Sequence, residues 1–207
     1  MDDAWASLEP HWQAAFELMW EAYVVGTIPV GAVITDSTGA IVARGRNRIT
    51  EEHDGSVAGT RLAHAEINAL MLLPSSSRYV DHTIHSTLEP CLLCFGALAI
   101  SRLGAIDYAA SDPYAGACHV EIDIPLVQNG PIAVTGPIAG WPALLSQSLV
   151  IANWHTRASP WRLYRAIEPF APEAHVGASR LLALQPSLDL EAGLPALLPR
   201  ILSDVLA

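Results

Sequence analysis

The sequence predicts an α/β fold in which a mixed sheet carries helices on its faces. Three observations predict it: an amphipathic helix near the N-terminus, a pair of β-rich runs directly after it, and strands that alternate with helices further along. Such alternation is typical of a sheet covered by helices, because each helix buries its apolar side against the sheet. At 207 residues the chain suits one domain with an appendage.

The first elements are predicted from the spacing of apolar and turn residues. From Glu9 to Val25, apolar side chains recur three and four positions apart, as in an amphipathic helix: Trp12, Ala15, Phe16, Met19 and Tyr23. β-rich runs follow over 29–36 and 40–47, and the Ser-Thr-Gly between them predicts a hairpin. The stretch over 48–60 is rich in glycine, threonine and acidic residues without periodicity, so it predicts a loop.

The rest of the chain alternates between the two kinds of element. The sequence predicts helices over 64–73, 91–101 and 142–154, strands over 81–87, 105–110 and 131–138, and a turn-rich loop over 111–119. Pro74 stops the first of these helices. Beyond Pro169 the composition shifts to alanine, leucine and proline, which predicts a helical extension packed on the domain or on a partner subunit. We therefore expect a domain over 1–168 and a helical C-terminal extension over 169–207.

Composition and charge exclude several classes of protein. A hydrophobic content of 51% with 15% charged residues argues against a disordered chain. The net charge of −10 argues against general affinity for nucleic acids or anionic membranes, because phosphate contacts need surplus cations. The acidic start does not resemble a signal peptide, and the longest apolar stretch is about half a membrane span. We expect a soluble, cytoplasmic protein, in which cysteines stay reduced and serve metal binding or catalysis rather than disulfides.

Two of the three cysteines stand three positions apart in "TLEPCLLCFGALAISR", at the start of a predicted helix. With "LAHAEINAL" upstream, the pattern His-x-Glu followed by Pro-Cys-x-x-Cys resembles the signature of zinc deaminases. Cys91 and Cys94 share one helix face and can reach one ion, and the positive helix end is expected to lower the pKa of both thiols. His64 supplies a third ligand. Three protein ligands leave tetrahedral zinc one position for water, as catalytic sites require.

Glu66 lies two positions after His64, so the two side chains leave the helix in different directions and need not share the metal. Two thiolates neutralise the charge of zinc and weaken it as a Lewis acid. A separate base for the water therefore has a reason to exist. Glu66 fits this role: it takes a proton from water, gives it to a ring nitrogen and later helps the amine leave as ammonia.

Other interpretations of the cysteine pair remain open at this point. A redox Cys-x-x-Cys requires neither His64 nor Glu66. A closed structural zinc site needs a fourth ligand, although none of the candidates has a matching short spacing: Cys118, His119, His85 and His82. His53, His82 and His155 are expected at the surface or in loops rather than as ligands.

Taken together, the motifs resemble the cytidine deaminase-like superfamily, and within it the branch of bacterial tRNA adenosine deaminases and small guanine or cytosine deaminases. The resemblance covers roughly 9–154 and rests, in this order, on "AFELMWEA", "PVGAVI", "GRNR", "HAEINAL", "TLEPCLLCFGA" and "YAASDPYAGA". It implies a three-layer α/β/α sandwich around a five-stranded mixed sheet. It also implies a homodimer or higher assembly whose subunits help complete neighbouring pockets, and a zinc-dependent deaminase domain over 1–168.

The resemblance also assigns residues at the metal and the reacting group. His64, Cys91 and Cys94 match the family's zinc ligands, with one Zn²⁺ per chain, and Glu66 matches the proton shuttle. The reaction that it implies replaces an exocyclic amine by a carbonyl and releases ammonia.

Further residues are assigned to the substrate pocket. Asn47 matches an asparagine that hydrogen-bonds the substrate ring, and an amide can both donate to and accept from a base edge. Asp112 matches an aspartate of a loop beside the substrate, while Leu88, Glu89 and Pro90 shape the pocket wall. The alternative interpretations are a turn residue at a strand end for Asn47 and a turn-initiating Asp-Pro for Asp112.

The main substrate prediction is a nucleobase, nucleoside or related amino-heterocycle. Adenosine in a tRNA anticodon is the alternative, and a catalytically silent zinc-binding regulatory domain is a third hypothesis, against which the intact Glu66 argues. The loop before His64 carries acidic residues near the path of an RNA phosphate: Glu51, Glu52 and Asp54. In contrast, a later run interleaves arginines with aromatics, which suits RNA but also suits an amphipathic helix: Trp154, Arg157, Trp161, Arg162, Tyr164 and Arg165.

Overall fold

The computed structural model describes residues 3–75, 77–156, 169 and 171–206. The strands are β1 (Gly31–Thr35), β2 (Ile41–Arg46), β3 (Thr83–Ser86), β4 (Ala105–Tyr108) and β5 (Ala133–Thr135). The helices are α1 (Asp3–Ala6), α2 (Pro10–Val24), α3 (Ala65–Leu70), α4 (Leu92–Ile100), α5 (Pro125–Gln128), α6 (Trp141–His155), α8 (Pro172–Leu184) and α9 (Leu194–Asp204). The arginines and aromatic residues over 157–165, which the sequence suggests could form an RNA-binding or amphipathic segment, lie outside the described residues.

The five strands form one mixed sheet in the order β2-β1-β3-β4-β5. β1 pairs antiparallel with both β2 and β3, whereas β3, β4 and β5 run parallel to one another. Parallel neighbours need crossover connections, and α4 supplies the one between β3 and β4. The predicted five-stranded mixed sheet with helices is therefore confirmed, and the predicted hairpin is β1–β2.

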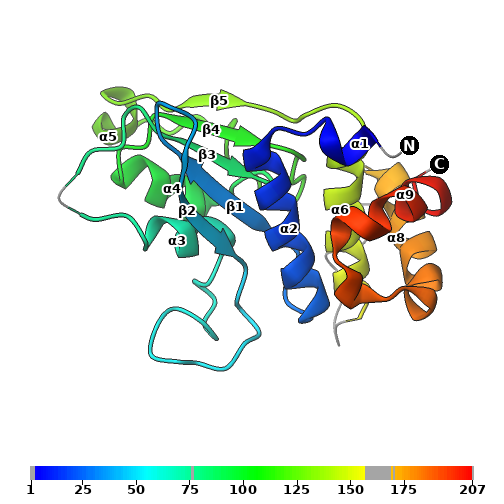
Figure 1. Cartoon of the computed structure of the whole chain (residues 1–207). Coiled ribbons are helices and arrows are strands. Elements are labelled where there is room, and N and C mark those ends of the chain that lie inside the picture. Colours follow the sequence, from blue (N-terminus) through cyan, green and yellow to red (C-terminus); the bar gives the residue numbers. More distant parts are fainter. Residues whose placement is uncertain (1–2, 76, 157–168, 170, 207) are drawn as a thin grey trace.

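Helices cover both faces of the sheet (Figure 1). α2 and α6 pack on one face around the buried side chains of Phe16 and Leu149, and α3 and α4 pack on the other around Ile84 and Leu98. Two strand glycines permit this close approach. A Cβ on Gly31 would overlap the backbone of α2, and a Cβ on Gly45 would overlap the backbone of α3. These two glycines therefore let α2 and α3 lie close against opposite faces of β1 and β2.

The C-terminal helices add an outer layer on the side of α2 and α6 (Figure 1). α8 packs along α6, and the apolar side of α9 is buried in the same core. Two hydrogen bonds tie α2 to this region: the Trp20 indole donates to the carbonyl of Leu190 at 3.1 Å, and the Tyr23 hydroxyl lies 3.1 Å from the side-chain oxygen of Gln185. The predicted boundary between 168 and 169 stays a prediction.

Element ends differ from the sequence-based expectation where local chemistry intervenes. The helix expected over 64–73 is α3, and it ends at Leu70 because the residue before a proline disfavours the helical conformation. The last turn before Pro74 closes through short-range bonds such as Leu73 N–H to the carbonyl of Leu70. α1 and α5 span only four residues each, too few to show a periodicity. Among the described helices, none is long and apolar enough to span a membrane.

Candidate functional site

The residues predicted to hold a metal meet where two helices begin. His64 is the N-cap residue of α3, and Cys91 is the N-cap residue of α4. Glu66 lies in the first turn of α3, while Cys94 lies in the first turn of α4. β3 follows α3 and precedes α4 in the chain. It runs back from the end of α3 toward the start of α4, so both helix starts lie at the same end of the strands. The three residues predicted as zinc ligands thus lie together in a group that could hold an ion.

The three donor atoms have the spacing that a tetrahedral ion requires. His64 Nδ1 lies 3.5 Å from Cys91 Sγ and 3.4 Å from Cys94 Sγ, and the two sulfurs are 3.7 Å apart. Zinc bonds of about 2.3 Å to sulfur and 2.0 Å to nitrogen, at tetrahedral angles, give separations of about 3.8 and 3.5 Å. Within the described residues, this is the group of three whose donor atoms can hold a metal ion.

The electrostatics of the cluster favour a bound cation. A hydrogen bond between the two sulfurs lowers the pKa of the Cys91 thiol to about 4. The same hydrogen bond, burial and the nearby Glu66 carboxylate raise the pKa of Cys94. The sequence prediction of a lowered pKa is therefore wrong for Cys94, because its buried sulfur faces a thiolate and a carboxylate. The thiols of Cys91 and Cys94 and the carboxyl of Glu66 can be negative together only if a nearby cation offsets their charge. A zinc ion meets that requirement.

Glu66 lies in an environment that disfavours the charged form of its carboxyl group. Its side chain is only 4% exposed, and burial raises its pKa. Its Oε1 accepts a hydrogen bond from Ser86 Oγ at 3.4 Å, and its Oε2 accepts one from Cys94 Sγ at 3.4 Å. Glu66 therefore lies beside the three donor atoms and is held from two sides.

A cavity of about 300 Å³ opens onto these residues. Asn47, Glu89 and Asp112 line it together with His64, Glu66 and Cys91, whereas the third donor residue, Cys94, is fully buried and does not line it. The remaining lining residues are mostly apolar or aromatic: Ile28, Val30, Ala65, Leu88, Tyr114, Ala115, Val150 and Trp154. Of these, only Leu88 was predicted as a pocket residue. Two of the others are aromatic, and the rings of Tyr114 and Trp154 meet edge-on, with centroids 6.5 Å apart. Tyr114 lies in the quoted "YAASDPYAGA" motif, which is a signal that could have identified it.

Glu89 holds the loop on which Asp112 lies. One carboxylate oxygen accepts the backbone N–H of Asp112 at 3.2 Å, and the other accepts that of Cys118 at 3.1 Å. Gly116 permits this arrangement, because a Cβ there would overlap the Glu89 carboxylate. Glu89 is only 7% exposed, so its carboxyl oxygens bind backbone N–H groups of the loop instead of water.

Glu89→Gln is expected to lower the free energy of unfolding by about 1–3 kcal/mol, because an amide offers one acceptor to two backbone donors and leaves one N–H unpaired. Thermal unfolding measures this loss. The matched control is Glu52→Gln, since Glu52 is exposed on the loop after β2 and should leave stability unchanged. Equal stability of the two variants would show that Glu89 does not hold the loop.

The other candidate ligands do not join the donor group. Cys118, His82, His85 and His119 are all outside the group of three that can hold an ion within the described residues. The histidines have other partners: His119 with Tyr108, His82 with Asp81, and His85 with Thr35. The described part of the chain therefore offers three ligands from histidine and cysteine, which is the number typical of an open zinc site.

Comparison with known proteins agrees with this geometry. The family model described as "Cytidine and deoxycytidylate deaminase zinc-binding region" matches residues 6–110. A tRNA-specific adenosine deaminase of Haemophilus influenzae is 38% identical over 106 residues, covering 50% of this chain and 58% of that protein. The chain covers less than two thirds of the length of the first curated relatives that it matches.

Two solved structures share the fold. One comes from biochemical and structural studies of A-to-I editing by tRNA:A34 deaminases; it is 26% identical with a TM-score of 0.52, and the match covers 60% of this chain and 95% of that one. The other is a guanine deaminase from Nitrosomonas europaea, 20% identical with a TM-score of 0.53, covering 70% of this chain and 84% of that one. The second likeness shows the fold alone.

The matched region spans just over half of the chain and contains the donor cluster, Glu66 and Asn47. The chain belongs to the cytidine and deoxycytidylate deaminase family, whose members bind zinc.

Proposed function

We propose that this chain is a zinc-dependent hydrolase that removes the exocyclic amine of a nucleobase, nucleoside or related amino-heterocycle. His64, Cys91 and Cys94 hold one zinc ion per chain. The observation that carries the proposal is the meeting of these donor atoms, 3.4–3.7 Å apart, with the buried carboxyl of Glu66 at one cavity.

When bound, zinc supplies Lewis-acid activation of the attacking water. Glu66 accepts the water proton on a carboxylate oxygen and delivers it to the ring nitrogen beside the amine. The same carboxyl then takes the second proton of the water, from the hydroxyl now on the carbon, and gives it to the departing amine. The oxygen of water thus replaces the nitrogen, so that C–NH2 becomes C=O and ammonia leaves. Burial of Glu66 suits this role, because a raised pKa makes its carboxylate a better proton acceptor than that of an exposed glutamate.

The remaining pocket residues orient the ring. Asn47 lies at the end of β2 and is 3% exposed, so its amide can hydrogen-bond a ring edge without competition from bulk water. Asp112 accepts the backbone N–H groups of Tyr114 and Ala115 on its Oδ1, which fixes its carboxylate at the cavity. Apolar and aromatic walls limit the entry of bulk water, so that the attacking water is the one activated at the metal site.

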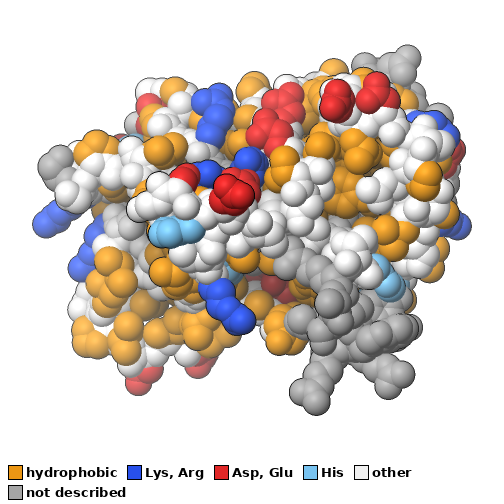
Figure 2. All heavy atoms as spheres, turned by 90° about the horizontal axis from the view of Figure 1, so that it is seen from below, with side chains coloured by type: hydrophobic (Ala, Val, Ile, Leu, Met, Phe, Trp, Pro, Cys, Tyr) orange, Lys and Arg blue, Asp and Glu red, His pale blue; other side chains and the backbone are white. Residues whose placement is uncertain are grey.

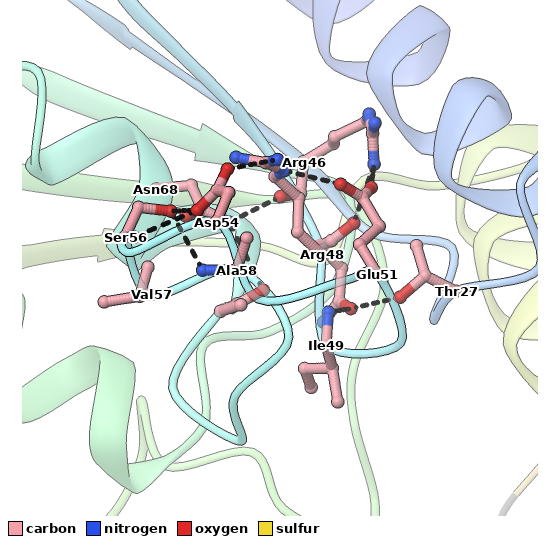
Figure 3. Close-up of polar contacts among 12 residues, drawn as sticks. Thr27, Arg46, Arg48, Ile49, Glu51, Asp54, Ser56, Val57, Ala58 and Asn68 are labelled. Atoms are coloured by element: carbon pink, nitrogen blue, oxygen red, sulfur yellow. Dashed lines mark hydrogen bonds and ion pairs between the residues drawn. The ribbon is translucent and has the colours of Figure 1, made fainter.

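The charges around the cavity favour a small substrate. Among the described residues that line it, the charged groups are acidic, and none is an arginine. The nearby Arg46 and Arg48 are already paired: Arg46 with Glu51, and Arg48 with Glu51 at 2.8 Å and with Asp54 at 3.1 Å (Figure 3). Guanidinium groups neutralised in this way are poorly placed to hold RNA phosphates.

Adenosine in tRNA is the second candidate, and the comparisons favour it. The Haemophilus influenzae relative is named a tRNA-specific adenosine deaminase, and a solved neighbour comes from studies of tRNA:A34 deaminases. The arginines that could hold RNA in this chain, Arg157, Arg162 and Arg165, lie outside the described residues.

A substrate panel separates the two candidates. Zinc-loaded protein is expected to release ammonia from at least one of guanine, cytosine, their nucleosides or an aminotriazine. It is expected to form no inosine in a tRNA anticodon stem-loop at the same enzyme concentration. Conversion of the stem-loop with every small molecule inert would reverse the choice. Inertness toward both, with zinc present, would favour a silent regulatory domain.

We also propose that the chain forms a homodimer through the outer side of α4. Large apolar side chains are exposed there and on the adjoining end of α3: Leu92 at 63%, Leu93 at 41%, Ile100 at 71%, Met71 at 54% and Leu72 at 62%. Hydrophobic side chains gather at the lower left of Figure 2, on the side where Figure 1 places α3 and α4. Contiguous exposed apolar surface of this kind marks an interaction site.

Ile100→Glu is expected to convert a dimer into a monomer, because it places a charge in the apolar contact. Light scattering of the eluting protein measures the mass. Val176→Glu is the matched control, since Val176 is 52% exposed on α8, away from this surface, and should leave the dimer intact. A parent protein with the mass of one chain would contradict the proposal.

A further inference from the structure

The amide of Asn47 is held by two groups that the assigned site does not include. Its Oδ1 accepts a hydrogen bond from the Thr27 hydroxyl at 2.7 Å and one from the backbone N–H of Ile49 at 3.1 Å. Figure 3 shows the Thr27 side chain directed toward Ile49. Thr27 and Asn47 are 0% and 3% exposed, respectively, so neither bond competes with bulk water.

The backbone donor settles which way the amide is turned. A backbone N–H can only donate, so the Asn47 atom that faces Ile49 must be the oxygen. The Thr27 hydroxyl can rotate, and it therefore donates to the same oxygen. The amide nitrogen is left for the cavity, and it has no hydrogen-bond partner within the described part of the chain.

Thr27 is itself fixed between two helices. Its backbone N–H donates to the carbonyl of Ala22 at 3.0 Å, at the end of α2. Its carbonyl accepts the side-chain amide of Asn153 on α6 at 2.8 Å. α6 also supplies Trp154 and Val150 to the cavity wall, so the element that shapes the wall also holds Thr27.

We propose that Thr27 is a positioning residue that turns Asn47 into a dedicated hydrogen-bond donor and thereby selects substrates. This inference rests on the proposed function and narrows its substrate class. From the sequence alone, the Asn47 amide could donate hydrogen bonds to a substrate or accept them. In the structure its oxygen is already bonded, so it can only donate hydrogen bonds through its N–H groups. A ring bound here must present an acceptor, a carbonyl oxygen or an unprotonated ring nitrogen, on the edge that faces Asn47 while its amine faces Glu66. A ring with N–H at that position is excluded, because two donors would meet.

Thr27→Val and Thr27→Ser test the inference on the best substrate of the panel. Valine has nearly the same shape without the hydroxyl, so KM should rise roughly 5- to 10-fold with a smaller change in kcat. Serine keeps the donor and should restore a KM near that of the parent. In an Asn47→Ala background, Thr27→Val should cause no further loss, because there is no amide left to orient. A loss of equal size in both backgrounds, or a KM unchanged by Thr27→Val, would overturn the inference.

A neutron structure of the deuterated parent protein gives a readout that does not depend on turnover. We expect the Thr27 deuteron on the line to the Asn47 oxygen and both amide deuterons of Asn47 on the cavity side. Amide deuterons directed at Thr27 would refute the inference even if the protein is an active deaminase. Absence of activity together with the expected deuterons would instead refute the proposed function and leave the amide orientation standing.

Discussion

Glu66→Gln is expected to lower turnover by about 10²- to 10⁴-fold while the protein keeps its fold and its zinc. Glutamine has the shape of glutamate and can still accept the hydrogen bond from Ser86, but it cannot take a proton from water. The loss should be large because one carboxyl serves several proton transfers in the proposed reaction. Glu66→Ala should lose at least as much. Ammonia release under saturating substrate measures the effect.

The control for Glu66 is Glu173→Gln, an exposed glutamate in the first turn of α8, which should keep the parent rate. Metal analysis and circular dichroism of each variant check that only the chemistry has changed. Release of ammonia by Glu66→Gln at close to the parent rate would show that another group moves the proton.

Cys91→Ser is expected to lose most of the bound zinc and, with it, the activity. A serine hydroxyl stays protonated near neutral pH, so the site loses one of its two thiolates and about 10²-fold or more in affinity. The Cys91 thiolate is also the group whose pKa is lowered to about 4 by its hydrogen bond with Cys94, so it is ready to bind metal across the physiological range. Metal analysis of the purified variant measures the loss.

The chain supplies a matched control in its third cysteine. Cys118 lies outside the donor group, and its thiol has a pKa raised to about 12 by burial, so Cys118→Ser should keep one zinc per chain. Full zinc content in Cys91→Ser, or equal loss in both variants, would contradict the assignment of the ligands.

Much of the fold could be predicted from local patterns. The apolar spacing between Trp12 and Tyr23 defines α2, and the two β-rich runs define the β1–β2 hairpin. The donor cluster was predictable because its members begin helices. Because β3 joins these two helices, it brings His64 and Cys91 to the same end of the sheet's strands. Recognising where these two helices begin was therefore enough to predict that their first residues lie close together in space.

The parts that could not be predicted depend on contacts between residues far apart in the sequence. The hydroxyl of Thr27 meets Asn47 20 positions away, and its carbonyl meets Asn153 126 positions away. The spacing of apolar and polar residues along the sequence does not predict contacts of this kind. The raised pKa of Cys94 depends partly on such contacts. The hydrogen bond with Cys91 raises it first, and burial and Glu66 on another helix add to this against the effect of the helix end.

The role of Glu89 was also beyond the sequence. Its position before Pro90 suggested a wall of the pocket, which it does line. Its bonds to the backbone of Asp112 and Cys118 arise only because the loop after β4 folds back over it. A carboxylate that accepts backbone donors in this way has no local sequence signature.

The most direct test of the account is a reaction run in water enriched in oxygen-18, with the zinc-loaded protein and the best substrate of the panel. Hydrolytic deamination predicts one ammonia for each product molecule and one oxygen-18 atom in the new carbonyl of that product. The central claim would be contradicted by ammonia release without incorporation of the label, or by a zinc-loaded protein that releases no ammonia from any substrate offered.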